Sequence, residues 1–283
     1  MKKRVISGAL IVGILLTLLF LSEYIVFSIG LAALAVIAVF EMLRVMGVHK
    51  KIALALPAYL LSSAFPILAF FVKDENRLHS ILIMAACFFI YMLWLMGVSV
   101  FSKGKISFSK IGEVFTAITY ISVSFTSLAI VRYISEYGYL FIFLAFLIPW
   151  ICDVFAFLIG CKFGKHKLIP EVSPKKSVEG AVAGIAFTVI FCLIFGFASS
   201  LVFKEVVPNY IALVVYGLIL SVVSQLGDLV ASVIKRQYGA KDYGKIFPGH
   251  GGVMDRFDSV LGISTILLIL CLVWPPFTVV PIV

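Results

Sequence analysis

Residues 208–234, PNYIALVVYGLILSVVSQLGDLVASVI, form an apolar run long enough to cross a membrane as a helix. About 20 apolar residues are enough to span the hydrocarbon core of a bilayer. At about 100° per residue, three polar residues in its second half and the lysine that follows it fall within an arc of about 80°. They are Gln225, Asp228, Ser232 and Lys235. The run therefore predicts a membrane helix with one polar stripe.

Similar apolar runs fill most of the chain. Hydrophobic residues make up 63% of the 283 and charged residues only 13%, too few to cover a water-soluble surface. The sequence predicts an all-α, polytopic membrane bundle of about nine transmembrane helices, with about five spans in residues 1–134 and a catalytic region in 135–283. The predicted spans are 5–21, 24–43, 52–72, 78–100, 111–133, 138–161, 180–203, 208–234 and 259–280.

The net charge of +9 is explained mainly by membrane orientation. If the N terminus is cytoplasmic, nineteen of the 23 Lys and Arg lie on the cytoplasmic side, as the positive-inside rule requires. No nucleic-acid partner is expected. Ten of these nineteen lie in the last two cytoplasmic segments, which are also rich in Gly, Ser, His and Asp. The active face should therefore be cytoplasmic and should meet an anionic partner.

Two polar residues lie where lipid is expected. Asp153 is surrounded by the apolar run 146–160, and an Asp at a helix centre costs about 2.5–3.5 kcal/mol on insertion scales. We therefore expect Asp153 and Gln225 to line a polar cavity. The alternatives are an Asp that caps a neighbouring helix or pairs with a Lys, and a stripe that forms only a hydrogen-bonded helix seam.

Residues 241–258, KDYGKIFPGHGGVMDRFD, carry the densest group of chemical signals. Glycines around His250 let backbone N–H groups approach an anion, and the following helix offers its positive N-terminal end. Asp255 and Asp258 share one helix face, where a divalent cation would keep both ionised. Hard oxygen ligands beside Lys and Arg indicate Mg²⁺ holding a nucleotide or pyrophosphate, unless these acids only stabilise the helix N terminus.

A second candidate loop precedes the predicted span 180–203. It reads SPKKSVEG over residues 173–180, and Pro174 fixes an extended turn. Its lysines are expected to face an anionic layer, and Ser177 to Gly180 is typical of a helix start. Alternatively, the loop is merely attracted to lipid headgroups.

The motif in residues 235–258 resembles the signature of the phosphatidate cytidylyltransferases, also called CDP-diacylglycerol synthases. It comprises Lys235-Arg236, four residues, Lys241-Asp242, Gly244, Phe247 to Val253, and Asp255 to Asp258. Residues 173–180, 224–235 and Asp153 with Ala156 add to the resemblance, which covers 150–260. Phe157 and Ser177 stand where the family often has Tyr and Thr.

The resemblance implies transfer of a cytidylyl group from CTP to phosphatidate, giving CDP-diacylglycerol and pyrophosphate at the cell membrane. It implies Mg²⁺ bound by Asp228 and Asp255, in a paired site whose second cation is K⁺. Asp258 either binds the second ion or orients Lys235, and Ser232 and Lys235 position the reacting phosphate. The residues expected to bind CTP and phosphatidate are Ser173, Lys175, Lys176, Arg236, Lys241, His250 and Arg256. Membrane lipid surrounds the chain, and a homodimer is compatible with the family.

Two other classes of membrane protein are alternatives. In an ion-coupled secondary transporter, Asp153, Asp228 and Lys235 would form the coupling relay. The inverted repeat of such transporters is not evident in the sequence. A phosphotransferase acting on CDP-alcohols would carry a run of acids beginning Asp-Gly, and the chain has no Asp-Gly.

Overall fold

The computed structural model describes residues 13, 17, 21–72, 76–247, 249 and 251–279. Eight helices within these residues are long and apolar enough to cross a membrane. The all-helical, polytopic class predicted from the sequence is thereby confirmed. The predicted first span, 5–21, lies almost wholly outside the described residues.

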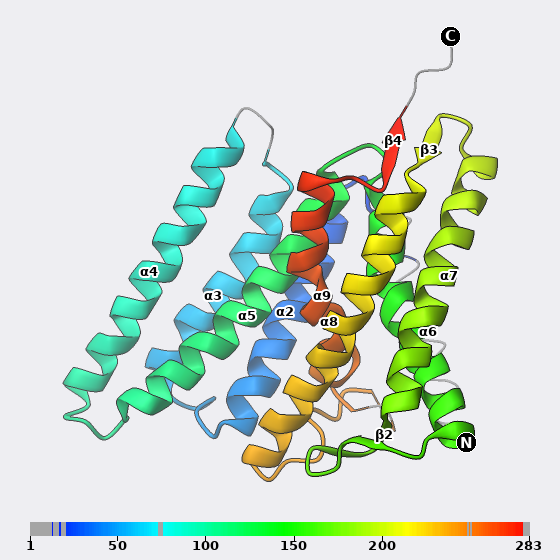
Figure 1. The fold of residues 1–283 in the computed structure, drawn as a ribbon. Coiled ribbons are helices and arrows are strands. Elements are labelled where there is room, and N and C mark those ends of the chain that lie inside the picture. Colours follow the sequence, from blue (N-terminus) through cyan, green and yellow to red (C-terminus); the bar gives the residue numbers. More distant parts are fainter. Residues whose placement is uncertain are drawn as a thin grey trace. The chain divides into compact units, whose positions relative to one another are not determined.

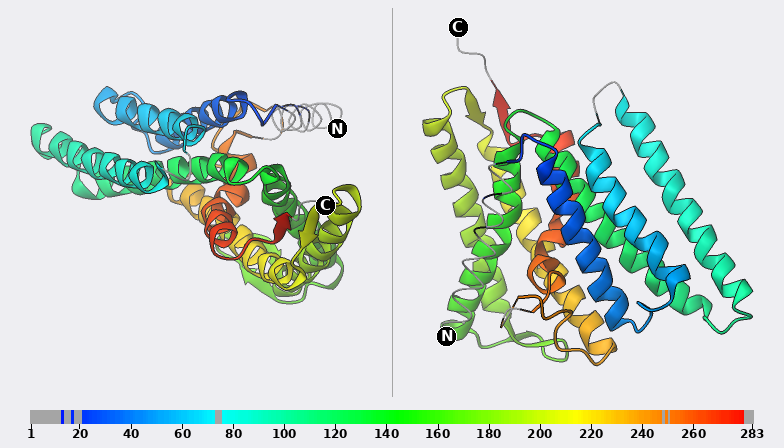
Figure 2. Two further views of the ribbon diagram at one scale, coloured as in Figure 1. Left: turned by 90° about the horizontal axis from the view of Figure 1, so that it is seen from above. Right: turned by 180° about the vertical axis from the view of Figure 1, so that it is seen from behind.

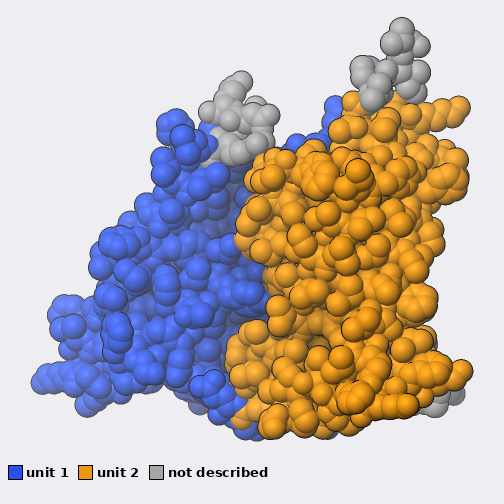
Figure 3. Space-filling view, viewed as in Figure 1, with its two compact units in different colours: residues 1–139, 237–257 blue, residues 140–236, 258–283 orange. Residues whose placement is uncertain are grey.

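The chain divides into two compact units, coloured separately in Figure 3. Unit 1 comprises Met1–Tyr139 and Gln237–Phe257, and unit 2 comprises Leu140–Arg236 and Asp258–Val283. The glycine-rich segment, residues 243–254, thus belongs to the same unit as the N-terminal helices. The functional division predicted at residues 134 and 135 stays a prediction.

Unit 1 is built from α2 (Val26–Val45), α3 (Ile52–Ala69), α4 (Arg77–Phe101) and α5 (Phe108–Tyr133). Helices α2, α3 and α5 pack against one another, and α4 packs on α3 and α5 (Figures 1 and 2). Ala35 and Ala38 of α2 are fully buried. Small side chains at such positions let membrane helices approach closely.

Helix α5 is the most polar of the predicted spans, and its hydroxyl groups are nevertheless buried. Ser122, Ser124 and Thr126 are at most 4% exposed. The Thr126 hydroxyl donates to the Ser122 carbonyl at 2.6 Å, one turn back along the helix. This backward hydrogen bond lets a hydroxyl-rich sequence remain helical within an apolar environment.

Unit 2 is formed mainly by α6 (Gly138–Phe163), α7 (Val178–Val202), α8 (Tyr210–Gln237) and α9 (Met254–Val273). Helices α6 and α7 approach closely at Gly184, where a Cβ would lie 2.9 Å from the Cys152 carbonyl oxygen. Helices α8 and α9 do the same at Gly227, where a Cβ would lie 2.8 Å from the Asp258 carbonyl oxygen. Both contacts require a residue without a side chain.

Two short antiparallel strand pairs supplement the helices. Strand β1 (Lys167–Ile169) pairs with β2 (Ser173–Ser177), and β3 (Val206–Pro208) pairs with β4 (Phe277–Val279). The ninth predicted span, 259–280, is displaced, because α9 ends at Val273 and β4 follows. Pro275 and Pro276 explain the early end, since proline lacks the N–H that a helix interior needs.

Candidate active site

The polar stripe predicted on α8 comprises Gln225, Asp228, Ser232 and Lys235. Gln225 is 7% exposed, and the other three are partly buried. On the other side of α8, Leu226 and Val230 are 53% and 51% exposed. A helix that exposes its apolar face and covers its polar face is suited to lipid rather than water. The stripe therefore faces protein groups within unit 2.

The carboxyl group of Asp258 on α9 lies within electrostatic range of three charged residues of unit 2. They are Asp153 of α6, and Asp228 and Lys235 of α8. Asp258 also accepts the N–H of the next residue, Ser259, at 2.8 Å. Charged residues of α6 and α8 thus act on the Asp258 carboxyl group of α9.

Lys176 of β2 adds a second positive charge to this group. Its Nζ lies 2.6 Å from Oδ2 of Asp228, and both side chains are about three-quarters buried, at 23% and 29% exposed. Successive residues of a strand point to opposite sides, which places Lys175 away from this ion pair. Lys175 is indeed exposed. We call Asp153, Lys176, Asp228, Lys235 and Asp258 the acidic cluster.

The acidic cluster has the chemistry of a site for a hard cation. Its three carboxyl groups outnumber its two ammonium groups, so a further positive charge would favour the ionised form of all three. The Lys176 ammonium shows that the Asp228 carboxylate accepts a cation at one of its oxygens. Among the residues that the structure describes, no three His, Cys, Asp or Glu side chains are close enough together to hold a metal ion. The carboxylate oxygens are hard donors of the kind that Mg²⁺ prefers, but the described residues do not form a closed ligand set.

Gln225 has a different environment from the rest of the stripe. Its Nε2 donates to the Ala181 carbonyl at 3.3 Å and to the Cys152 sulfur at 3.4 Å. These bonds connect α8 to α7 and α6, as the helix-seam alternative predicts for this residue. A position lining a polar cavity stays a prediction for Gln225 and Asp153, although Asp153 is exposed.

The loop that carries Lys176 is held at both ends. The Ser177 hydroxyl accepts the Gly180 N–H at 3.2 Å and caps α7, which confirms the predicted helix start. Glu179, in the first turn of α7, lies 2.7 Å from Nδ1 of His166, just before β1. The two contacts fix the β1–β2 pair, and with it Lys176, to the start of α7.

In unit 1, Asp255 organises the glycine-rich segment. Its Oδ2 accepts three backbone N–H groups: Tyr243 at 2.8 Å, Gly252 at 3.0 Å and Gly244 at 3.3 Å. Gly251, with φ of +85°, adopts a left-handed conformation that favours glycine. One oxygen of this predicted metal ligand is therefore engaged in holding the loop.

Other predicted substrate-binding residues are accessible. Lys175, Arg236, Lys241 and Arg256 are exposed, and Ser173 is partly exposed. His250 lies outside the described residues. Of the residues predicted to bind substrate, Lys176 forms an ion pair with a predicted metal ligand, Asp228.

Two residues of α2 that the sequence analysis missed contact the glycine-rich segment. Glu41, 1% exposed, accepts the Met254 N–H at 3.0 Å, and Arg44 donates to the Tyr243 carbonyl. The available signal was an acid within the otherwise apolar predicted span 24–43, because such residues are rare in lipid.

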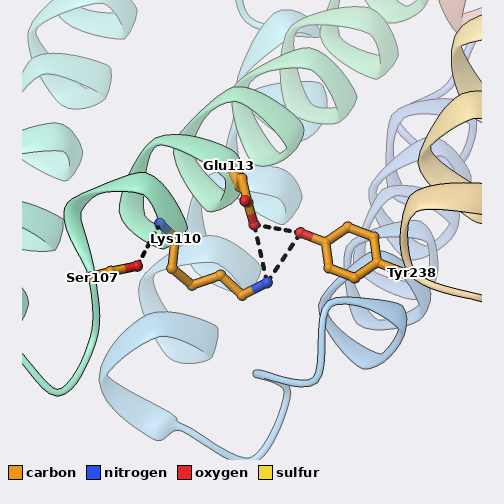
Figure 4. Close-up of polar contacts among 4 residues, drawn as sticks. All are labelled: Ser107, Lys110, Glu113 and Tyr238. Carbon is orange, nitrogen blue, oxygen red and sulfur yellow. Dashed lines mark hydrogen bonds and ion pairs between the residues drawn. The ribbon is translucent and has the colours of Figure 1, made fainter.

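A second missed cluster joins α5 to the residue that follows α8 (Figure 4). Nζ of Lys110 lies 3.0 Å from both Oε2 of Glu113 and the hydroxyl of Tyr238, which itself donates to Glu113. Burial raises the pKa of Tyr238, and the neighbouring Glu113 carboxylate adds to the rise. The phenol therefore stays protonated and anchors the start of the segment leading to Lys241.

A charged cluster set among membrane helices favours a membrane enzyme that acts on charged substrates, and comparison with known proteins defines its kind. Residues 2–274 match the Cytidylyltransferase family. The phosphatidate cytidylyltransferase of Bacillus subtilis (strain 168) is 36% identical over 280 residues, covering 95% of this chain and 97% of the relative. That of Staphylococcus saprophyticus is 40% identical over 176 residues, covering 62% and 65%. That of Staphylococcus aureus (strain COL) is 41% identical over 172 residues, covering 61% and 63%.

The chain therefore belongs to the phosphatidate cytidylyltransferases of the Cytidylyltransferase family, multi-pass membrane enzymes of phospholipid synthesis. The resemblance read from residues 235–258 is confirmed. The transporter alternative is not supported by any of these relatives.

Proposed function

We propose that the acidic cluster is where this chain transfers the cytidylyl group of CTP to phosphatidate. A phosphate oxygen of phosphatidate forms a bond to the α-phosphorus of CTP. The bond from that phosphorus to the bridging oxygen breaks, and pyrophosphate leaves with the electron pair. CDP-diacylglycerol remains in the membrane. The observation that carries the proposal is the gathering of three acids and two lysines from four separate elements of unit 2.

The chemical difficulty of this reaction is electrostatic. The phosphatidate phosphate is already anionic near neutral pH, so little base catalysis is needed. Two polyanions must approach each other, and positive groups positioned before the reaction reduce their repulsion in the transition state. Lys176 and Lys235 are the positive groups of the cluster. Asp258 either orients Lys235, a role that the electrostatic interaction between them supports, or binds the second cation.

Magnesium is the proposed cofactor. Asp228, Asp255 and Asp258 are its proposed ligands, with K⁺ as the second cation of a paired site. Bound Mg²⁺ supplies charge neutralisation and alignment of phosphate oxygens. The carboxylate excess of the acidic cluster supports this assignment.

The remaining proposed residues act on the substrates. Ser232 of α8 positions the reacting phosphate together with Lys235. CTP reaches the site from the cytoplasm and phosphatidate from the cell membrane, where two copies of the chain form a homodimer. The residues proposed to hold CTP and the phosphatidate headgroup are Ser173, Lys175, Lys176, Arg236, Lys241, His250 and Arg256.

Pyrophosphate release by protein purified in mild detergent tests this proposal. Release should require CTP, phosphatidate and Mg²⁺ together, and chelation of Mg²⁺ should stop it. Asp228→Asn and Asp255→Asn should each lower the rate at least about 100-fold, because each removes a charge that holds the cation. Glu171→Gln is the control, since Glu171 is an exposed acid between β1 and β2 that has no proposed role. Near-normal rates in the first two variants would remove those residues from the site.

A further inference from the structure

The glycine-rich segment, residues 243–254, is attached to α2 by two side chains that the proposed site does not include. Glu41 accepts the N–H of Met254 at 3.0 Å, at the end of the segment. Arg44 donates to the carbonyl oxygen of Tyr243, at its beginning. The two residues are three positions apart and therefore share one face of α2. The helix face thus holds both ends of the segment.

Glu41 is placed as a helix cap supplied by another helix. Met254 is the first residue of α9, and the first N–H groups of a helix have no partner within it. A carboxylate beside them is stabilised by the helix dipole. Glu41 is 1% exposed, and an acid inside a membrane helix is costly enough that it commonly marks function.

The backbone of the segment is fitted closely around this carboxylate. A Cβ at Gly244 or Gly252 would collide with the carboxylate of Glu41. The same two glycines donate their N–H groups to Asp255. The backbone at Gly244 and Gly252 is therefore packed against the Glu41 carboxylate and hydrogen-bonded to the Asp255 carboxylate. A shift of either carboxylate would move this backbone and, with it, the other carboxylate.

We propose that Glu41 is a positioning residue for cytidylyl transfer. It fixes the backbone at the start of α9 and thereby sets the orientation of the Asp255 carboxylate. Glu41 does not touch the reacting atoms. This inference rests on the proposed role of Asp255 in the site.

Three substitutions of Glu41 separate the effect of its side-chain length from the effect of its negative charge. Glu41→Gln keeps the length and an acceptor for the Met254 N–H, Glu41→Asp keeps the charge but is one methylene shorter, and Glu41→Ala removes both. We expect Glu41→Gln to keep kcat within about threefold, and the other two to lower it by about 100-fold, because a displacement of about 1 Å can cost that much. KM for CTP should change less than kcat. Glu136→Gln, at an exposed acid of unit 1, is the control.

Thermal unfolding of each variant is measured beside its kinetics. A merely structural Glu41 would change the unfolding temperature but leave kcat per folded molecule unchanged, and that result would overturn the proposal. If Glu41→Ala yields no folded protein, the comparison of Glu41→Gln with Glu41→Asp decides. Equal kcat in those two variants would also overturn it.

A double-mutant cycle tests the contact directly. Gly252 does not have a positive φ, and the atoms nearest to a Cβ added there belong to the Glu41 carboxylate, so Gly252→Ala should be harmful mainly through that collision. In the Glu41→Ala background, Gly252→Ala should therefore lower kcat by less than about twofold more. Additive losses would contradict the proposed contact. Asp255→Asn is measured in parallel: full activity there would remove Asp255 from the site and overturn the role of Glu41 with it, whereas its loss with full activity in Glu41→Ala would overturn only the role of Glu41.

Discussion

The two neighbouring lysines of β2 have different electrostatic environments. Lys176 pairs with Asp228 at 2.6 Å, whereas Lys175 is exposed. The alternation of a strand explains this difference, because neighbouring side chains point to opposite sides. A partly buried ion pair beside two further carboxylates is screened by water less than an exposed lysine is.

Lys176→Ala should therefore reduce both stability and turnover. It leaves the carboxylates of the acidic cluster with one ammonium group, so we expect a lower unfolding temperature and a loss of at least about tenfold in kcat. Lys175→Ala should raise KM for CTP or phosphatidate and leave the unfolding temperature unchanged. Kinetics and thermal unfolding in detergent check both expectations.

Lys167→Ala is the control for these two variants, because Lys167 is an exposed lysine of the paired strand β1. An unchanged rate in Lys175→Ala would favour the alternative that this loop only contacts lipid headgroups. An unchanged rate in Lys176→Ala would exclude its ammonium from catalysis.

At the scale of elements, the contact between α8 and α9 sets the spacing of the acidic cluster. Gly227 directly precedes Asp228, and a Cβ there would lie 2.8 Å from the carbonyl oxygen of Asp258 and 3.3 Å from Cα of Gly262. Helix backbones approach this closely only at small residues. The missing side chain at Gly227 therefore determines how near the two aspartates lie.

Gly227→Ala should force α8 and α9 apart. We expect a loss of about 1–3 kcal/mol in the free energy of unfolding, the usual cost of overpacking, together with lower turnover. Gly112→Ala in α5 is the matched control, because no atom lies within 4 Å of a Cβ added there. Alanine is favoured over glycine in a helix by about 1 kcal/mol, so the control should be neutral or stabilising. Thermal unfolding in detergent compares the two, and equal behaviour would contradict the tight contact.

At the scale of the whole molecule, the distribution of Lys and Arg defines an orientation. If the N terminus is cytoplasmic, the eight described spans and the predicted first one would place residues 102–107 on the cytoplasmic side and residues 203–207 outside. The cytoplasmic N terminus is a proposal that follows from the positive-inside rule.

Cysteine labelling of intact cells tests this orientation. In a chain without its five cysteines, Lys204→Cys should react with a membrane-impermeant maleimide from outside. Lys105→Cys should react only after the membrane is opened. The reverse pattern would place the acidic cluster and its substrates on the outer side, which is incompatible with the use of cytoplasmic CTP.

Much of the fold could be read from local patterns. A membrane span is a property of about 20 consecutive residues, so hydropathy alone located α2 to α9 within a few residues. The main difference is at α9, where Pro275 and Pro276 end the helix before the predicted boundary. The motif in residues 235–258 was likewise sufficient for the family, because its residues are close in the sequence.

The partners of the polar residues were decided only by tertiary packing. Asp228 forms an ion pair with Lys176, and Glu41 accepts a hydrogen bond from Met254, which is 213 positions away in the sequence. Such contacts depend on which helix faces pack together, and one sequence carries no direct signal of that. Hydropathy and periodicity act over one or two turns, whereas a hydrogen bond between distant segments forms only when the bundle has assembled. The family and the membrane spans therefore followed from the chain alone, and the positions of its charges did not.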